Sequence, residues 1–179
     1  MIPCWSCHQD TLAESLCPAC GKLQPARPRD AFAVLGLGTP RYHLDEKAIE
    51  KAWRELSRKV HPDRFAKADA RERRFALEQT TQLNDARKTL KHPTRRAEYL
   101  FKQAGYTVPG EEAGKHGAGE VLPLEFYEQV MDDREALGDA RAEGPEAVQK
   151  LAARVLSQKE QTLAVVEAAF TEWETTGDT

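Results

Sequence analysis

Apolar residues recur at three- and four-residue spacing over two stretches in the middle of the chain, and this spacing predicts two long helices. The first begins near the candidate N-cap Asp45 and ends before Pro62. Its apolar stripe consists of Ile49, Ala52, Trp53, Leu56 and Val60. The second is expected over 70–90, with Asp69 and Glu72 as a capping pair. Its stripe consists of Phe75, Ala76, Gln79, Leu83, Ala86 and Leu90. The two helices should form an antiparallel hairpin.

Further helical stretches surround this hairpin. Short helices are expected over 31–37 and 94–103, where they would cover its open side. In the C-terminal third, Gly144-Pro145 separates two more apolar stripes. The first consists of Tyr127, Val130, Met131 and Leu137, and the second of Val148, Ala152, Val155, Leu163, Val166, Phe170 and Trp173. The pattern predicts an all-α chain that ends in a helical hairpin or bundle.

Glycine, proline and cysteine divide the chain into four parts. Residues 1–28 contain all four cysteines and end in a proline-containing linker, and 29–104 contain the central helices. Residues 105–121 are rich in glycine and are expected to be a flexible linker, and 122–179 form the C-terminal helical domain. We therefore expect a small cysteine module, a central domain and a C-terminal domain.

Charge is distributed unevenly along the 179 residues. Residues 31–104 carry 17 basic and 10 acidic side chains, whereas residues 105–179 carry 6 basic and 16 acidic ones. This asymmetry suggests two different partners, and an uneven solvated surface is the alternative. No apolar run approaches the ~20 residues of a membrane helix, and the first cysteine follows Met1 so closely that no signal peptide fits. A cytoplasmic location without membrane attachment is expected.

The four cysteines form two pairs, Cys4-x2-Cys7 and Cys17-x2-Cys20. Each pair can present two sulfurs to one ion from a tight turn, and two such turns complete a tetrahedral shell. The pattern predicts a closed, structural Zn²⁺ site, and chelation should unfold so small a module. The alternatives are iron, disulfides, a dithiol redox pair, or His8 in place of one cysteine.

The tripeptide His61-Pro62-Asp63 lies between the two long helices. Pro62 fixes φ and removes a backbone donor, so the first helix ends there and the flanking side chains are held in a rigid turn. That helix also carries a basic face away from its apolar stripe, made of Lys47, Lys51, Arg54 and Arg58. A basic face that ends in a rigid loop suits an acidic partner. A plain helix stop beside a solvated face is the alternative.

These motifs together resemble the J-domain family, and more narrowly the zinc-bearing form of the iron-sulfur J-proteins called HscB. The resemblance covers almost the whole chain. The matching stretches are Cys4-Trp5-Ser6-Cys7, Cys17-Pro18-Ala19-Cys20, Leu23-Gln24-Pro25, His61-Pro62-Asp63-Arg64-Phe65, Leu83-Asn84-Asp85-Ala86, Arg96-Ala97-Glu98-Tyr99-Leu100 and Arg134-Glu135-Ala136-Leu137.

The resemblance implies a J domain and a co-chaperone function. In the family, the basic helix and the tripeptide dock on a DnaK/HscA-type chaperone ATPase and speed its ATP hydrolysis. The C-terminal helices hold the client, an IscU-type iron-sulfur cluster scaffold protein. The residues here that match the family's scaffold contacts are Tyr127, Glu128, Met131, Asp132 and Glu135. From the residues alone, Tyr127 and Met131 lie one helical turn apart and could equally belong to a core.

The chain also departs from the family pattern. The family's C-terminal domain is a three-helix bundle, whereas this sequence ends after the second of those helices, so either a third helix is missing or the bundle is built differently. The family also often places hydrophobic residues at Glu128 and Asp133. A J-protein with a different client is therefore the main alternative. An enzyme is disfavoured because no nucleophile or phosphate loop accompanies His61 and Asp63. A nucleic-acid binder is disfavoured because the acidic C-terminal third would repel phosphate.

Overall fold

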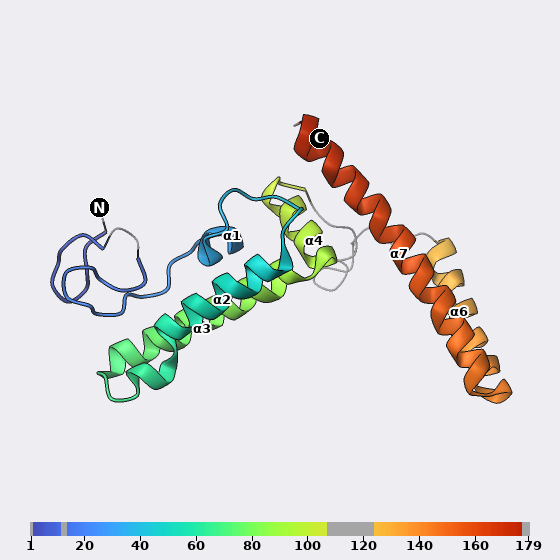
Figure 1. Ribbon diagram of the computed structural model, residues 1–179, viewed down its shortest axis with the longest axis horizontal. Helices are drawn as coiled ribbons and strands as arrows, with labels where there is room; N and C mark the ends of the chain where they lie inside the picture. The colour runs from blue at the N-terminus through green and yellow to red at the C-terminus, as the bar shows by residue number, and fades with distance from the viewer. Residues whose placement is uncertain (1, 12–13, 107–123, 177–179) are drawn as a thin grey trace. The chain divides into compact units, whose positions relative to one another are not determined.

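The computed structural model describes residues 2–11, 14–106 and 124–176, so most of the expected linker at 105–121 lies outside the described residues. The chain divides into two compact units, Met1–Arg96 and Ala97–Thr179. Figure 1 shows the helices of each unit. Because the two units are not placed relative to one another, each is described separately.

The first unit contains the predicted hairpin. Helix α2 (Glu46–Val60) and helix α3 (Ala70–Lys91) pack against each other, and the 3-10 turn η1 (Pro62–Phe65) lies in the loop between them (Figure 1). The Asp45 side chain caps α2 by accepting from the Lys47 N–H, as the sequence predicts. Asp69 caps α3 by accepting from the Glu72 N–H.

A short helix covers the hairpin and completes its core. Helix α1 (Ala31–Leu35) starts at the N-cap Asp30 and packs against both α2 and α3. Phe32 of α1, Ile49 of α2 and Leu90 of α3 are fully buried. Helix α1 ends because Gly36 takes the left-handed conformation, with φ of 66°, that a C-terminal cap requires. Burial of these apolar side chains holds the three helices together.

A buried arginine forms hydrogen bonds at the end of the hairpin. Helix α4 (Pro93–Gln103) begins directly after α3, and its Arg96 is 5% exposed. The guanidinium donates to the carbonyl of Leu90 at 2.7 Å and to the carbonyl of Tyr42 at 2.6 Å, and it lies 5.5 Å from the Tyr42 ring. Arg96 therefore joins the start of α4 to the segment between α1 and α2.

The second unit contains the end of α4 and two long helices, α6 (Leu124–Glu143) and α7 (Pro145–Thr176), which pack against each other. Gly144 separates them with a φ of 123°, a value that side chains disfavour, and Pro145 restarts the helix. Phe170 of α7 is buried in edge-to-face contact with Phe101 and Trp173.

The all-α prediction is confirmed over the described residues. Regular structure there consists of helices and the 3-10 turn, and β-pairing is limited to the isolated bridges Pro3–Asp10 and Leu16–Leu23. None of the described helices combines the length and the hydrophobicity that a membrane span requires.

Candidate docking face and metal centre

The four cysteine sulfurs converge on one point. Cys4 Sγ lies 3.7 Å from Cys20 Sγ, Cys7 Sγ lies 3.7 Å from Cys17 Sγ, and all four sulfurs lie within 4.8 Å of one another. These separations are too long for a disulfide, whose S–S bond is about 2.05 Å. A tetrahedral ion bound at about 2.3 Å would place its sulfurs about 3.8 Å apart. The four thiols therefore fit a single metal ion.

The two cysteine pairs lie in two separate backbone turns of the same type. The Cys4 N–H donates to the Gln9 carbonyl at 2.8 Å, and the Cys17 N–H donates to the Lys22 carbonyl at 2.9 Å. Four residues after the first cysteine of each pair, the chain takes a left-handed conformation, at His8 with φ of 61° and at Gly21 with φ of 71°. His8 is thus an exposed turn residue, and the group of side chains that could hold a metal ion consists of the four cysteines.

Backbone and side-chain donors surround the buried Cys4 sulfur. Burial opposes ionisation of this thiol, but hydrogen bonds from the backbone of Cys7 and Ser6 and from the Gln24 side chain lower its pKa to about 6. The Ser6 N–H and the Gln24 Nε2 each lie 3.3 Å from this sulfur. Donors of this kind stabilise a thiolate, which is the form that binds metal.

The cysteine module (residues 1–28) is attached to α3 through a buried carboxylate. Glu72 is 5% exposed, and its Oε1 accepts from the Leu23 N–H at 3.1 Å. Its Oε2 lies 2.6 Å from Lys22 Nζ, and this hydrogen bond raises the pKa of Lys22. Lys22 and Leu23 lie two and three residues after Cys20, so the turn that positions the second pair of sulfurs is also bonded to α3.

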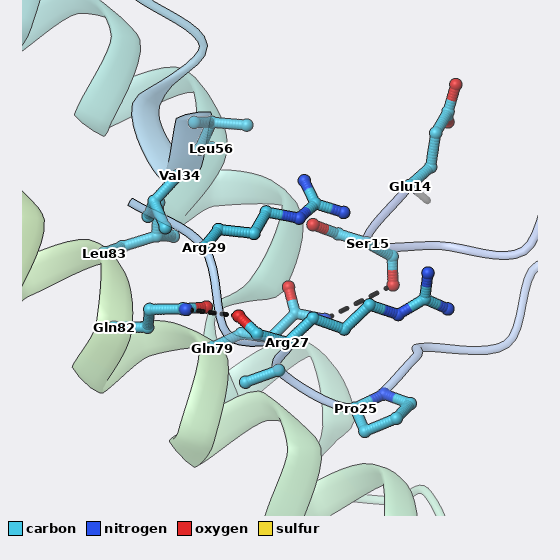
Figure 2. A pocket seen from close by; sticks show the side chains of 11 residues that line it. Glu14, Ser15, Pro25, Arg27, Arg29, Val34, Leu56, Gln79, Gln82 and Leu83 are labelled. Atoms are coloured by element: carbon cyan, nitrogen blue, oxygen red, sulfur yellow. Dashed lines mark hydrogen bonds between the residues drawn. The ribbon is translucent and has the colours of Figure 1, made fainter. Parts of the chain in front are cut away.

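Two glutamines of α3 extend this attachment, as Figure 2 shows. Gln79 Nε2 donates to the Gln24 carbonyl at 2.6 Å, with a longer bond to the Ser15 carbonyl at 3.4 Å. Gln82 Nε2 donates to the Arg27 carbonyl at 2.6 Å. The backbone of the cysteine module therefore forms hydrogen bonds with side chains along about three turns of α3.

An aromatic contact closes the same interface. The Trp5 ring meets Phe75 of α3 edge to face at 6.0 Å, and the Trp5 Nε1 donates to the Leu23 carbonyl at 2.7 Å. The Arg71 guanidinium lies 5.0 Å from the Trp5 ring centre. Trp5 thus joins the two cysteine turns to each other and to the helix.

The tripeptide forms a rigid turn at the end of α2. His61 leaves the helical conformation with φ of −56° and ψ of 132°, and Pro62 starts η1. His61 Nδ1 accepts from the Asp63 N–H at 3.3 Å and lies 3.4 Å from Asp63 Oδ2. The side chains of His61 and Asp63 are 52% and 90% exposed, so both are available to a partner.

The basic face leads directly into this turn. Its members Lys47, Lys51, Arg54 and Arg58 are all exposed and line one shallow groove along α2. A second shallow hollow joins Arg54 and Arg58 to His61. The structure thus brings the predicted basic residues and His61 of the tripeptide into one continuous surface.

Side chains of α3 hold α2 beneath this surface. Trp53 Nε1 donates to Asn84 Oδ1 at 2.9 Å, and the Arg87 guanidinium lies 4.4 Å from the Trp53 ring centre. Arg87 also pairs with Glu50 at 2.7 Å, as does Lys91 at 2.9 Å. Hydrogen bonds from Arg87 and Lys91 lower the pKa of Glu50 to about 2.

The five candidate client residues lie exposed on α6. Tyr127 is 47% exposed and Met131 is 65% exposed, so they are surface residues rather than core residues. Their acidic neighbours are Glu128, Asp132 and Glu135. Asp133, where the family often has a hydrophobic residue, pairs instead with Arg154 of α7 at 3.2 Å.

Comparison with known proteins decides the family. The DnaJ domain model matches residues 30–99. Over 172 residues the chain is 30% identical to the iron-sulfur cluster co-chaperone protein HscB of Mus musculus, a match that covers 93% of this chain and 70% of that protein. The chain belongs to the HscB family of J-domain co-chaperones. It is also 40% identical over 112 residues to the HscB homolog of Bordetella pertussis, where the match covers 63% of this chain and 62% of the relative.

Solved HscB structures share the fold. The crystal structure of human HscB superposes with a TM-score of 0.78 at 28% identity, over 97% of this chain and 86% of the human one. HscB of Vibrio cholerae superposes with a TM-score of 0.67 at 31% identity, over 82% of each chain. The relatives named here are co-chaperones by name.

The attachment of the cysteine module to α3 is the part of the site that sequence reasoning missed. The sequence predicts that Glu72 completes a capping pair, and it places Gln79 in an apolar stripe without a role of its own. Asp69 does cap the helix, but the Glu72 carboxylate binds Lys22 and Leu23 instead. A glutamine inside an otherwise apolar stripe is the signal that could have found this, because a buried amide requires a partner.

Proposed function

We propose that this HscB-family chain stimulates ATP hydrolysis by a DnaK/HscA-type chaperone through α2 and the tripeptide. The observation that carries the proposal is the continuous surface formed by the basic face and His61, with the exposed Asp63 two residues further along the chain. Four cations on one helix face attract an acidic partner and speed its approach. The turn then presents an imidazole and a carboxylate at one end of that surface.

Stimulation is tested by single-turnover ATP hydrolysis with a DnaK/HscA-type chaperone, with and without the purified chain. We expect the hydrolysis rate to rise with chain concentration and then saturate. The half-maximal concentration should increase with salt, because docking through exposed cations is screened. A rate that does not respond to the chain at any concentration would contradict the proposal.

We further propose that α6 binds an IscU-type iron-sulfur cluster scaffold protein and delivers it to the chaperone. Tyr127 and Met131 offer exposed apolar contacts beside the carboxylates of Glu128, Asp132 and Glu135. An apolar centre with a polar surround is the usual composition of a protein interface. A J-protein with another client would share the chaperone surface and differ only at α6.

Replacing Tyr127 and Met131 together by alanine should weaken scaffold binding by about tenfold or more, because truncation of interface anchors commonly costs this much. Val165→Ala is the matched control, since Val165 is an exposed apolar residue of α7 (70%) outside the proposed contact. Binding is measured by titration of the scaffold protein. No scaffold binding by the natural chain, with ATPase stimulation intact, would favour a different client.

The metal is proposed to be zinc. Cys4, Cys7, Cys17 and Cys20 would supply four thiolates, and their sulfur separations suit a tetrahedral ion. Four protein ligands leave no open position, so the ion would crosslink the two turns rather than act on a substrate.

A further inference from the structure

The last carbonyls of helix α2 accept hydrogen bonds from an unusual donor. In an α-helix the carbonyl of residue i accepts from the N–H of residue i+4, so Arg58 and Lys59 would accept from residues 62 and 63. Residue 62 is a proline and has no N–H. The N–H of Asp63 donates to His61 Nδ1 at 3.3 Å instead. Neither residue 62 nor residue 63 therefore donates a helical hydrogen bond to the carbonyls of Arg58 and Lys59.

A side chain replaces these donors. Arg64 Nη1 donates to the Arg58 carbonyl at 2.9 Å and to the Lys59 carbonyl at 3.4 Å. The Arg64 N–H donates to the His61 carbonyl at 3.0 Å, which closes η1. Arg64 thus bonds to the helix with its guanidinium and to the tripeptide with its backbone. A cation at this position also complements the negative end of the helix dipole.

We propose that Arg64 is a positioning residue: it holds the His61-Pro62-Asp63 turn against the end of α2, and stimulation of the chaperone depends on that orientation. The second part rests on the proposed co-chaperone function. Without the guanidinium, the Arg58 and Lys59 carbonyls would turn to water, and η1 would be joined to α2 only through the backbone. His61 and Asp63 would then sample several orientations.

Positioning and docking make different kinetic predictions for Arg64. A docking cation would contribute to affinity, so its loss would raise the half-maximal chain concentration and leave the maximal rate unchanged. A positioning residue leaves the basic face of α2 intact, so its loss lowers the maximal rate. We expect Arg64→Ala to reduce maximal stimulation about fivefold or more, since two hydrogen bonds are lost and a single one contributes about this much, with a half-maximal concentration within about twofold of the original.

The experiment compares three variants of the full chain. Arg64→Ala removes the contacts, and Arg64→Lys keeps the charge on a shorter side chain and should recover part of the stimulation. Lys67→Ala is the control, because it removes an exposed cation three residues further along the same loop. Its stimulation should match that of the natural chain. Full activity of Arg64→Ala, or a change in half-maximal concentration alone, would overturn the inference.

A second readout needs no chaperone. The ¹⁵N order parameter of the Asp63 amide should be near about 0.85 in the natural chain and fall toward about 0.6 in Arg64→Ala, with Lys67→Ala unchanged. Equal order parameters in all three chains would overturn the positioning role. If the natural chain fails to stimulate any chaperone, the proposed function fails, and this measurement still decides whether Arg64 holds the turn.

Discussion

Glu50 links the two long helices through two cations of α3. Its Oε1 lies 2.7 Å from Arg87 Nη2 and 2.9 Å from Lys91 Nζ, and Arg87 also stacks on Trp53. These interactions favour the charged carboxylate, which is why its pKa falls from the ordinary 4.5 to about 2. The basic face lies on the same helix, so this cluster helps to hold the proposed docking surface in place.

The lowered pKa of Glu50 makes its contribution depend on pH. Because the folded pKa is depressed, the stabilisation is present above about pH 4.5 and is lost as the pH falls toward 2. The difference in melting temperature between the natural chain and Glu50→Gln should therefore be largest near pH 7 and shrink between pH 4.5 and 2. Thermal melts followed by circular dichroism measure this.

Glu55→Gln is the matched control for the titration, because Glu55 is an exposed carboxylate on the same helix. Its melting temperature should track that of the natural chain at each pH, apart from general effects of charge. A Glu50→Gln difference that stays constant from pH 7 to pH 3 would show that the pairing with Arg87 and Lys91 is not what Glu50 contributes.

Helix α3 is the element shared by the docking surface and the metal centre. One side of it packs against α2, and its side chains Glu72, Gln79 and Gln82 bond to the cysteine module. The proposed metal holds the turns that present Lys22 and Leu23 to Glu72. Loss of the metal should therefore affect α3 as well as the cysteine module.

Metal removal tests this connection. Elemental analysis should find one zinc per chain, and a chain with neither zinc nor iron would contradict the metal centre. After chelation, amide exchange around 72–82 of α3 should accelerate about tenfold or more, because the buried side chains of Glu72 and Gln79 lose their backbone partners. Exchange in the buried part of α7 around Phe170 is the internal reference and should not change. Unaltered amide exchange in α3 would show that the metal does not stabilise this helix.

The helices of this chain could be predicted from sequence because their signals are local. Asp45 and Asp69 cap α2 and α3 as expected, and the apolar stripes place Ile49 and Leu90 in the core. The contact between the cysteine module and α3 joins residues about 50 positions apart, such as Lys22 and Glu72. No periodicity or short motif encodes a pairing of that kind.

Some features of the candidate sites can likewise be predicted from local sequence, and others require the structure. The convergence of the four cysteines follows from their spacing, and the exposure of His61 and Asp63 follows from Pro62. The role of Arg64 requires knowing which carbonyls lack a donor, and this depends on the hydrogen bond between Asp63 and His61. Helical spacing alone allows Met131 to be a core or a surface residue. Only the packing of α6 against α7 shows that it lies on the surface.

At the scale of the whole molecule, the uneven charge noted in the sequence corresponds to two proposed binding surfaces. The basic face belongs to the first unit, and the acidic client residues of α6 belong to the second. This separation suits a co-chaperone that contacts an ATPase and a client with different parts of its chain. The relatives of known name act as co-chaperones, and stimulation of a chaperone is the activity on which the proposal depends.

The most direct test is single-turnover ATP hydrolysis by a DnaK/HscA-type chaperone in the presence of the His61→Gln variant. His92→Gln is the control, because His92 is also exposed at the end of a long helix. We predict that His61→Gln lowers stimulation about tenfold or more without changing the melting temperature, since this side chain is 52% exposed and supports no core. Undiminished stimulation by His61→Gln would contradict the central claim.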